Sequence, residues 1–194
     1  MNNEKIVLAS GSPRRTKTLS TLGISFHQVI PTIDETPKQT ENPEDLVSRL
    51  SKEKAKAAAE KDPKHRLYLG TDTIVSYEDW IIGKPGSREE AEQMLTRLSG
   101  KTHQVISGVT FFNREQSKYI TRTSCTDVTI IPMTSPEILW YLDTEEWQGA
   151  AGGYRIQGKA ALFISSIKGE YSNVVGLPIN TFYGMLSEVN YQLR

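Results

Sequence analysis

The stretch Ser10-Gly11-Ser12-Pro13-Arg14-Arg15 most constrains how this chain of 194 residues can fold. It joins a short apolar run, residues 6–9, to a helical pattern. Ser12 suits the N-cap of that helix, and Pro13 suits its first position, where a missing N–H costs nothing. A strand that turns directly into a helix presents backbone N–H groups, hydroxyls and here two arginines, which favours binding of an anion such as phosphate. The alternative is an ordinary capped helix with two solvated arginines.

A second helix is predicted from Pro43, with Asn42 as its N-cap. Its apolar stripe includes Leu50, and Lys54 follows four residues later, so Lys54 lies on the same inward face. Such a lysine can extend its amine to solvent along apolar surface, or it can be directed at an acidic group.

Asp72 lies in the middle of a strand pattern, residues 67–75. Aspartate is depleted in strands, and burying it without a partner is expensive. Its position therefore indicates a catalytic duty or a partner cation, the plainer alternative being a buried ion pair. A loop before the second helix carries Asp34 and Glu35, which could equally be a solvated turn.

The rest of the chain predicts hairpins, further helices and one glycine-rich loop. We expect strands over 80–82, 104–112, 119–131 and 160–167, helices after Ser87, Ser135 and Pro178, and a ligand-approaching loop over 145–158. A capping box, Ser87 with Glu90, is expected to open the first of these helices. Since hairpins interrupt strict βαβ alternation, the prediction is an α/β fold with a mixed sheet and flanking helices, not a doubly wound sheet.

The overall charge and the single cysteine restrict the function classes. Basic and acidic residues balance at 23 each, which argues against a nucleic-acid binder or a membrane-surface binder. One cysteine, Cys125, excludes an internal disulfide and a multi-cysteine metal site and is typical of a reducing compartment. No signal peptide or membrane-spanning run is recognised, so a cytoplasmic protein is expected.

Eight motifs follow one another in an order that resembles the Maf family of nucleoside triphosphate pyrophosphatases. They are Ser10 to Arg15, Asp34-Glu35, Lys54-Ala55, Gly70-Thr71-Asp72-Thr73, Gly83-Lys84-Pro85, Thr102-His103 with Ser107-Gly108-Val109, residues 152–158, and residues 173–178. Each motif is weak alone, but their order over residues 5–188 is specific. One departure is Ala150, where a lysine is expected, while Arg155 stands where glycine is common.

The resemblance implies a fold related to the inosine triphosphatase (Maf/Ham1) superfamily, with residues 1–194 as a single domain of two lobes around a cleft. The Ser10–Arg15 loop, Glu35, Asp72 and Lys84 are expected to converge in that cleft. A homodimer is compatible with the family, but the residues themselves do not indicate one.

The implied reaction cleaves a nucleoside triphosphate between the α and β phosphates, giving a monophosphate and pyrophosphate. This chemistry requires a divalent metal, cations over the phosphates and a base for water. Glu35 and Asp72 are the expected ligands of Mg²⁺ or Mn²⁺, and Asp72 is also the expected base. The remaining assignments are Lys54, Lys84 and Arg15 for phosphate charge, and Ser10 and Ser12 for phosphate oxygens. His103 has no required role in such a mechanism and is interpreted as structural.

Two branches of the family differ after the strand aspartate, where Asp-Thr marks one and Asp-Gln marks the branch that prefers 7-methyl-GTP. Thr73, together with Arg14 and Gln157, resembles the branch that acts on dTTP and UTP. Outside the family pattern, Thr73 and Gln157 would be an ordinary strand hydroxyl and loop amide. The alternative function is a nucleotide-binding regulator of septum formation, although a pure binder has no need for Asp72 facing a polyphosphate.

Overall fold

The structure of the protein is a computed structural model that describes residues 5–39 and 41–193. The strands are β1 (Ile6–Ala9), β2 (Phe26–Val29), β3 (Leu67–Tyr77), β4 (Trp80–Ile82), β5 (Thr102–Asn113), β6 (Lys118–Ile130) and β7 (Ile164–Lys168). The helices are α1 (Pro13–Thr21), α2 (Pro43–Lys61), α3 (Arg88–Leu98), α4 (Ser135–Asp143), α5 (Tyr171–Val175) and α6 (Ile179–Leu186), with 3₁₀ turns η1 (Ala151–Gly153) and η2 (Lys159–Phe163).

Within the described residues, seven strands form a mixed sheet in the order β2-β1-β3-β5-β6-β7, with β4 paired to β3. Strand β1 runs parallel to both β2 and β3, whereas β4 and β7 run antiparallel to β3 and β6. The prediction of an α/β fold with a mixed sheet and flanking helices is confirmed. The chain divides into two compact units, and strands β3, β5 and β6 each contribute residues to both.

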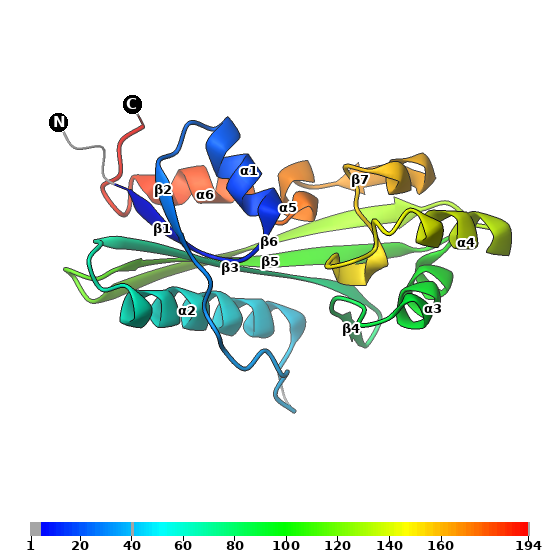
Figure 1. The fold of residues 1–194 in the computed structure, drawn as a ribbon, viewed down its shortest axis with the longest axis horizontal. Helices are drawn as coiled ribbons and strands as arrows, with labels where there is room; N and C mark the ends of the chain where they lie inside the picture. The colour runs from blue at the N-terminus through cyan, green and yellow to red at the C-terminus, as the bar shows by residue number, and fades with distance from the viewer. Residues whose placement is uncertain (1–4, 40, 194) are drawn as a thin grey trace. The chain divides into compact units, whose positions relative to one another are not determined.

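The first unit contains the described residues of 1–72, 107–124 and 176–194. Its buried strand β1 alternates between two apolar clusters, because successive side chains of a strand point to opposite faces. Ile6 and Leu8 join the cluster that includes Phe182 of α6, whereas Val7 and Ala9 join the cluster that includes residues of α2. Figure 1 shows α2 on one face of these strands and α1 and α6 on the other.

Helix α2 lies directly against the strands of the first unit because two glycines leave room for it. A Cβ atom on Gly70 of β3 would lie 2.0 Å from the carbonyl oxygen of Ser51, and one on Gly108 of β5 would lie 2.2 Å from that of Val47. The helix begins as predicted, since the Asn42 side chain accepts a hydrogen bond from the backbone N–H of Asp45. Glycine inside a strand is otherwise unfavourable, so both positions serve this close approach.

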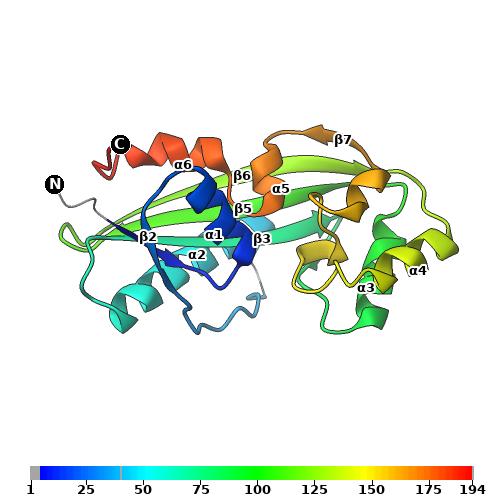
Figure 2. The ribbon, with the colours of Figure 1, turned by 45° about the horizontal axis from the view of Figure 1, so that its top comes forward.

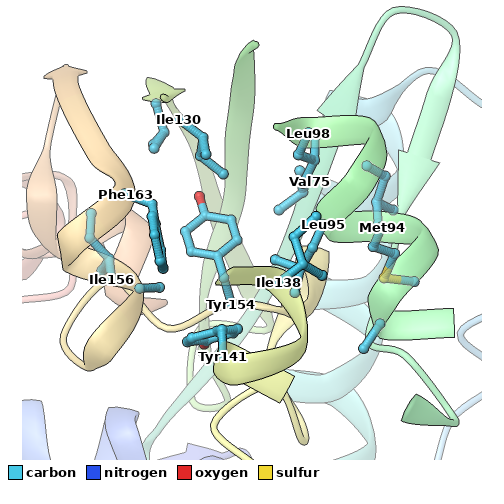
Figure 3. Packing of buried hydrophobic residues seen from close by; sticks show 14 of the residues in the cluster. Val75, Met94, Leu95, Leu98, Ile130, Ile138, Tyr141, Tyr154, Ile156 and Phe163 are labelled. Atoms are coloured by element: carbon cyan, nitrogen blue, oxygen red, sulfur yellow. The ribbon is translucent and has the colours of Figure 1, made fainter. Parts of the chain in front are cut away.

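The second unit contains residues 73–106 and 125–175 and has its own apolar cluster. Figure 3 shows the ring of Tyr154 inside this cluster, with Phe163 on one side and Val75 and Leu95 on the other. Figure 2 gives a second view of α3 and α4, whose inward side chains complete the cluster. Each unit therefore buries apolar residues of its own.

Two local predictions in the second unit are wrong in detail. The strand expected over 160–167 begins only at Ile164, because a 3₁₀ turn precedes it, with Ala160 and Phe163 three residues apart and both buried. The capping box is also incomplete. Ser87 accepts from the N–H of Glu90, but the Glu90 carboxylate accepts from the N–H of Gly86 instead of closing on Ser87.

Candidate active site

The turn between β1 and α1 is held by its own side chains and by one glutamine. The Ser10 hydroxyl accepts a hydrogen bond from the N–H of Ser12 at 3.2 Å, and the Ser10 carbonyl accepts from Gln28 Nε2 at 2.7 Å. Ser12 is at the N-cap of α1 as predicted, but its side chain makes no cap hydrogen bond. Gln28 lies on an exposed stretch of β2, and the sequence there carries no signal for this contact.

Arg15 is buried behind this turn. Its Nη1 donates to the Ser10 hydroxyl at 3.0 Å, and its Nε donates to the carbonyl oxygen of Gly176 at 2.8 Å. Burial lowers the pKa of Arg15 to about 10, while the charge of Asp72 opposes that shift. Arg15 is therefore still a cation at neutral pH, and it positions Ser10 relative to the turn before α6. Arg14, its half-buried neighbour, keeps its predicted role at the phosphates as a proposal.

Lys54 joins the two carboxylates that the sequence singled out. Its Nζ lies 2.5 Å from Asp72 Oδ1 and 2.7 Å from Glu35 Oε1. The side chains of Lys54 and Asp72 are only 9% and 10% exposed, whereas that of Glu35 is 53% exposed. The predicted inward orientation of Lys54 agrees with its burial on α2, and the acidic groups at which it is directed are Asp72 and Glu35.

The loop that carries Glu35 is fastened to α2. Asp34 Oδ1 accepts a hydrogen bond from the N–H of Thr36. Hydrogen bonding to the side chain and the backbone of Thr36 lowers the pKa of the Asp34 carboxyl. Arg49 of α2 donates to the carbonyl oxygen of Thr36 at 3.0 Å and pairs with Glu41 at 2.6 Å. The two adjacent acids of this loop thus have different tasks, since Asp34 shapes the turn and Glu35 reaches Lys54.

Ser10, Arg15, Glu35, Lys54 and Asp72 all belong to the first unit. The charges of both Asp72 and Glu35 act on Arg15, so its contacts and those of Lys54 form one electrostatic cluster. This part of the predicted convergence agrees with the structure. Gly70 lies in one of the family motifs, and the motif alone does not predict that it brings α2 to β3, although a glycine inside a strand is a recognisable signal of close approach.

Thr73, Lys84 and Gln157 belong to the second unit, and their site roles stay predictions. Lys84 and Gln157 are exposed, and Thr73 is half-buried. The glycine-rich loop is tied to the segment before Lys84, because the N–H of Gly152 donates to the carbonyl oxygen of Gly83 at 3.0 Å. The backbone of this loop therefore has a defined place within the second unit.

The two departures from the family pattern, Ala150 and Arg155, both lie in the second unit. Ala150 is 2% exposed, and the guanidinium of Arg155 donates from Nη2 to the carbonyl oxygen of Gln148 at 2.7 Å. His103 is buried in the same unit, and its Nε2 forms a 2.7 Å hydrogen bond with the Tyr154 hydroxyl. Burial lowers the pKa of His103 to about 4, so it is neutral at neutral pH, as its structural interpretation requires.

The donor set of Glu35 and Asp72 fits a hard divalent cation that relies on few protein ligands. Across residues 5–39 and 41–193, no cluster of three or more histidine, cysteine, aspartate or glutamate side chains is suited to hold a metal. Mg²⁺ characteristically uses one or two carboxylates together with water and substrate phosphates. Two carboxylate oxygens within hydrogen-bond distance of the same ammonium show that a single cation can engage both.

Comparison with known proteins supplies the relatives of this chain. A Bacillus cereus protein named dTTP/UTP pyrophosphatase is 45% identical over 176 residues, which cover 91% of each chain. Proteins of the same name from Bacillus anthracis and Symbiobacterium thermophilum are 42% and 40% identical, covering 96% and 98% of this chain and 96% of each relative. Among solved structures, the Staphylococcus aureus Ham1 protein has a TM-score of 0.45 at 16% identity, covering 66% of this chain and 72% of that chain. The family described as Maf-like protein matches residues 5–189, and the chain belongs to that family.

Proposed function

We propose that this chain hydrolyses dTTP and UTP between the α and β phosphates, releasing the monophosphate and pyrophosphate. The observation that carries the proposal is the buried Asp72 carboxylate, held with Glu35 by Lys54 in the interior of a sheet. Relatives that are 40–45% identical are named dTTP/UTP pyrophosphatase, which supports the choice of substrate.

Asp72 is the group that accepts the proton of the attacking water. Strand β3 fixes its position, so the carboxylate is held beside a water molecule on the side of the α phosphorus opposite the leaving pyrophosphate. A bound Mg²⁺ or Mn²⁺, held by Glu35 and Asp72, would acidify that water and balance phosphate charge. The water oxygen bonds to the α phosphorus while a proton passes from the water to Asp72, and pyrophosphate leaves as the bond between the α phosphorus and the bridging oxygen breaks.

The turn of residues 10–15 holds phosphate oxygens through the Ser10 and Ser12 hydroxyls and the backbone at the start of α1. Arg15 keeps Ser10 in place and adds a buried positive charge behind the turn. Lys54, Arg14 and Lys84 balance the remaining phosphate charge.

Gln157 is proposed to read the base, with Thr73 as a second contact. Its amide offers one acceptor and one donor, which match the N3–H and O4 edge shared by thymine and uracil. Cytosine reverses this pattern, so an amide held in the orientation that fits uracil would lose both hydrogen bonds, at a cost of about 1 kcal/mol for each bond. One methyl group changes discrimination by only about 1–3 kcal/mol, so dTTP and UTP are both substrates.

The proposal is tested by offering the purified protein each common nucleoside triphosphate and 7-methyl-GTP and measuring the phosphate products. We expect pyrophosphate and monophosphate from dTTP and UTP, with much slower turnover of CTP and the purines. Stepwise release of orthophosphate, or preference for 7-methyl-GTP, would overturn the assignment.

Base reading is tested separately with Gln157→Ala, and Gln148→Ala in the same loop serves as the control. We expect Gln157→Ala to reduce the ratio of kcat/KM for UTP over CTP by on the order of 10-fold, since one good hydrogen-bond match is lost. Gln148→Ala should leave the ratio unchanged, because Gln148 uses its backbone carbonyl for its contact with Arg155. An unchanged ratio in Gln157→Ala would remove Gln157 from base recognition while leaving the hydrolysis intact.

A further inference from the structure

We propose that Lys54 is a placeholder cation, which occupies both carboxylates of the metal site and disfavours metal binding until the nucleotide arrives. The inference rests on the proposed function, because it concerns the same two carboxylates. It assigns Lys54 a role before the reaction, in addition to its contact with phosphate during it.

The contacts of Lys54 are those a metal ion would have to replace. The same Nζ lies 2.5 Å from Asp72 Oδ1 and 2.7 Å from Glu35 Oε1, so one ammonium engages both carboxylates at once. Burial of the Lys54 and Asp72 side chains, at 9% and 10% exposure, shields this pair from water. A divalent cation that enters without nucleotide must therefore displace the Lys54 ammonium from its contacts with both carboxylates.

The packing of α2 against β3 fixes the backbone position of Lys54, so its contacts do not depend on side-chain flexibility alone. Gly70 allows α2 to approach β3 so closely that an added Cβ would lie 2.7 Å from the backbone nitrogen of Ala55, the residue after Lys54. The Glu35 loop is held from the same helix through Arg49, which donates to the carbonyl oxygen of Thr36. The positions of Lys54, Asp72 and Glu35 therefore all depend on contacts made by α2.

The cluster has no excess of negative charge before a ligand binds. Arg14, Arg15 and Lys54 carry positive charges, Asp72 and Glu35 carry negative ones, and the charges of Arg14 and of both acids act on Arg15. A divalent cation alone would leave an excess of positive charge in a largely buried site, which is costly. The triphosphate brings negative charge that both the metal and Lys54 can meet, so the two ligands bind better together than separately.

The affinity of the site for metal and its affinity for nucleotide therefore depend on each other. If the nucleotide draws Lys54 from the carboxylates toward phosphate, it raises the affinity for metal, and the metal raises the affinity for nucleotide by the same factor. Couplings of this kind typically lie at about 5–150-fold. Movement of Lys54 between the carboxylates and the phosphates is the step that links the two affinities.

The test measures Mn²⁺ binding by electron paramagnetic resonance without nucleotide, so it needs no turnover. The variants are Lys54→Gln, which removes the charge, Lys54→Arg, which keeps it, and Lys56→Gln as an exposed control on the same helix. We expect Lys54→Gln to bind Mn²⁺ on the order of 10-fold more tightly than the wild type. Lys54→Arg and Lys56→Gln should resemble the wild type.

The second arm adds a dTTP analogue with a non-hydrolysable link between the α and β phosphorus atoms. We expect the analogue to strengthen Mn²⁺ binding more in the wild type than in Lys54→Gln. Equal Mn²⁺ affinity of the two proteins without the analogue, or no Mn²⁺ binding in either arm, would overturn the placeholder role.

A measurement on the wild type covers the case in which Lys54→Gln does not fold. With isotope-labelled lysine, the side-chain NMR signal of Lys54 should stay in place when Mg²⁺ alone is added and should shift when Mg²⁺ and the analogue are added together. A full shift with Mg²⁺ alone would contradict the inference. Failure of the proposed function is recognised separately, because a wild type that hydrolyses neither dTTP nor UTP can still be titrated with Mn²⁺.

Discussion

At the residue scale, the buried Asp72 carboxylate has an energetic cost that Lys54 offsets. A charge that is 10% exposed is tolerated when it has a partner at hydrogen-bond distance, and Lys54 Nζ supplies that partner at 2.5 Å. Replacing such a buried pair with apolar residues is often neutral or stabilising, so stability alone gives no reason for its presence. The arrangement is better explained by chemistry at Asp72 than by its contribution to folding.

Asp72→Asn tests this explanation because it keeps the shape and removes both charge and basicity. We expect turnover of dTTP to fall on the order of 10²-fold or more, the usual range for loss of an acid–base group. Turnover is measured by pyrophosphate release, with circular dichroism to verify folding. Asp79→Asn, in the exposed turn after β3, is the matched control and should retain full turnover. Near-normal turnover of Asp72→Asn would remove Asp72 from the mechanism.

His103 gives a prediction for the pH dependence of stability. Burial lowers its pKa from 6.5 to about 4, so between these values the unfolded state binds more protons than the folded state. Above about pH 6.5 His103 is neutral in both states and does not reduce the free energy of unfolding. As the pH falls from about 6.5 toward about 4, protonation of His103 in the unfolded state lowers that free energy. The decline attributable to His103 should reach about 2 kcal/mol at pH 5.

The measurement is urea unfolding of the wild type and His103→Gln at pH 7.5 and pH 5. The variant removes the imidazole that bonds the Tyr154 hydroxyl and is expected to be less stable at pH 7.5. Its stability should nevertheless change less between the two pH values than that of the wild type. Parallel losses in both proteins would show that His103 does not contribute to acid sensitivity.

At the element scale, the contact between α2 and β3 is the structural requirement of the candidate site. Lys54 reaches Asp72 because Gly70 leaves the backbone of α2 room to lie against the strand. Burial of Leu46, Leu50 and Ala58 on the same helix face stabilises this packing. Any change that lifts the helix from the strand therefore alters both stability and the Lys54–Asp72 contact.

Gly70→Ala tests that dependence, with Gly184→Ala as a control of opposite sign. The new Cβ at Gly70 would meet the Ser51 carbonyl at 2.0 Å, so we expect destabilisation by roughly 1–3 kcal/mol or more, with loss of turnover. Gly184 is an exposed residue of α6, and a Cβ there meets nothing within 4 Å. Alanine at that site should stabilise by roughly 0.5–1 kcal/mol. Urea unfolding measures both, and equal effects would contradict the packing argument.

The predictions at this scale succeeded where local chemistry decides the structure. Asn42 and Pro43 correctly marked the start of α2, because capping depends on neighbours in the sequence. The strand expected over 160–167 was wrong for its first part, since the spacing of Ala160 and Phe163 is set by the cluster they join. The prediction of a capping box at Ser87 failed for a different, local reason, because the Glu90 carboxylate accepts from the neighbouring backbone N–H of Gly86.

At the scale of the whole molecule, the metal requirement is the decisive property of the proposed enzyme. We expect EDTA to abolish pyrophosphate release and Mg²⁺ or Mn²⁺ to restore it, because the proposed ligands are hard carboxylate oxygens. The measurement is product release before and after chelation, with circular dichroism as the control for folding. Full activity in excess EDTA would contradict the assignment of Glu35 and Asp72 as metal ligands.

Across the described residues, no helix is long and apolar enough to cross a bilayer. The predicted cytoplasmic location, the absence of a nucleic-acid partner and the homodimer stay predictions. The same holds for the treatment of residues 1–194 as one functional domain.

The sequence by itself determined the α/β class, most helix starts and the residue types of the candidate site. Those features depend on short-range patterns, such as the inward stripe that carries Lys54 and the strand that carries Asp72. Only the tertiary structure decided which groups meet. Lys54 bridges Glu35 and Asp72, and Arg15 holds Ser10 against Gly176, because α2 and the turn before α6 pack on the first strands. These contacts join residues far apart in the chain. They depend on how buried segments pack together, which local sequence patterns do not specify.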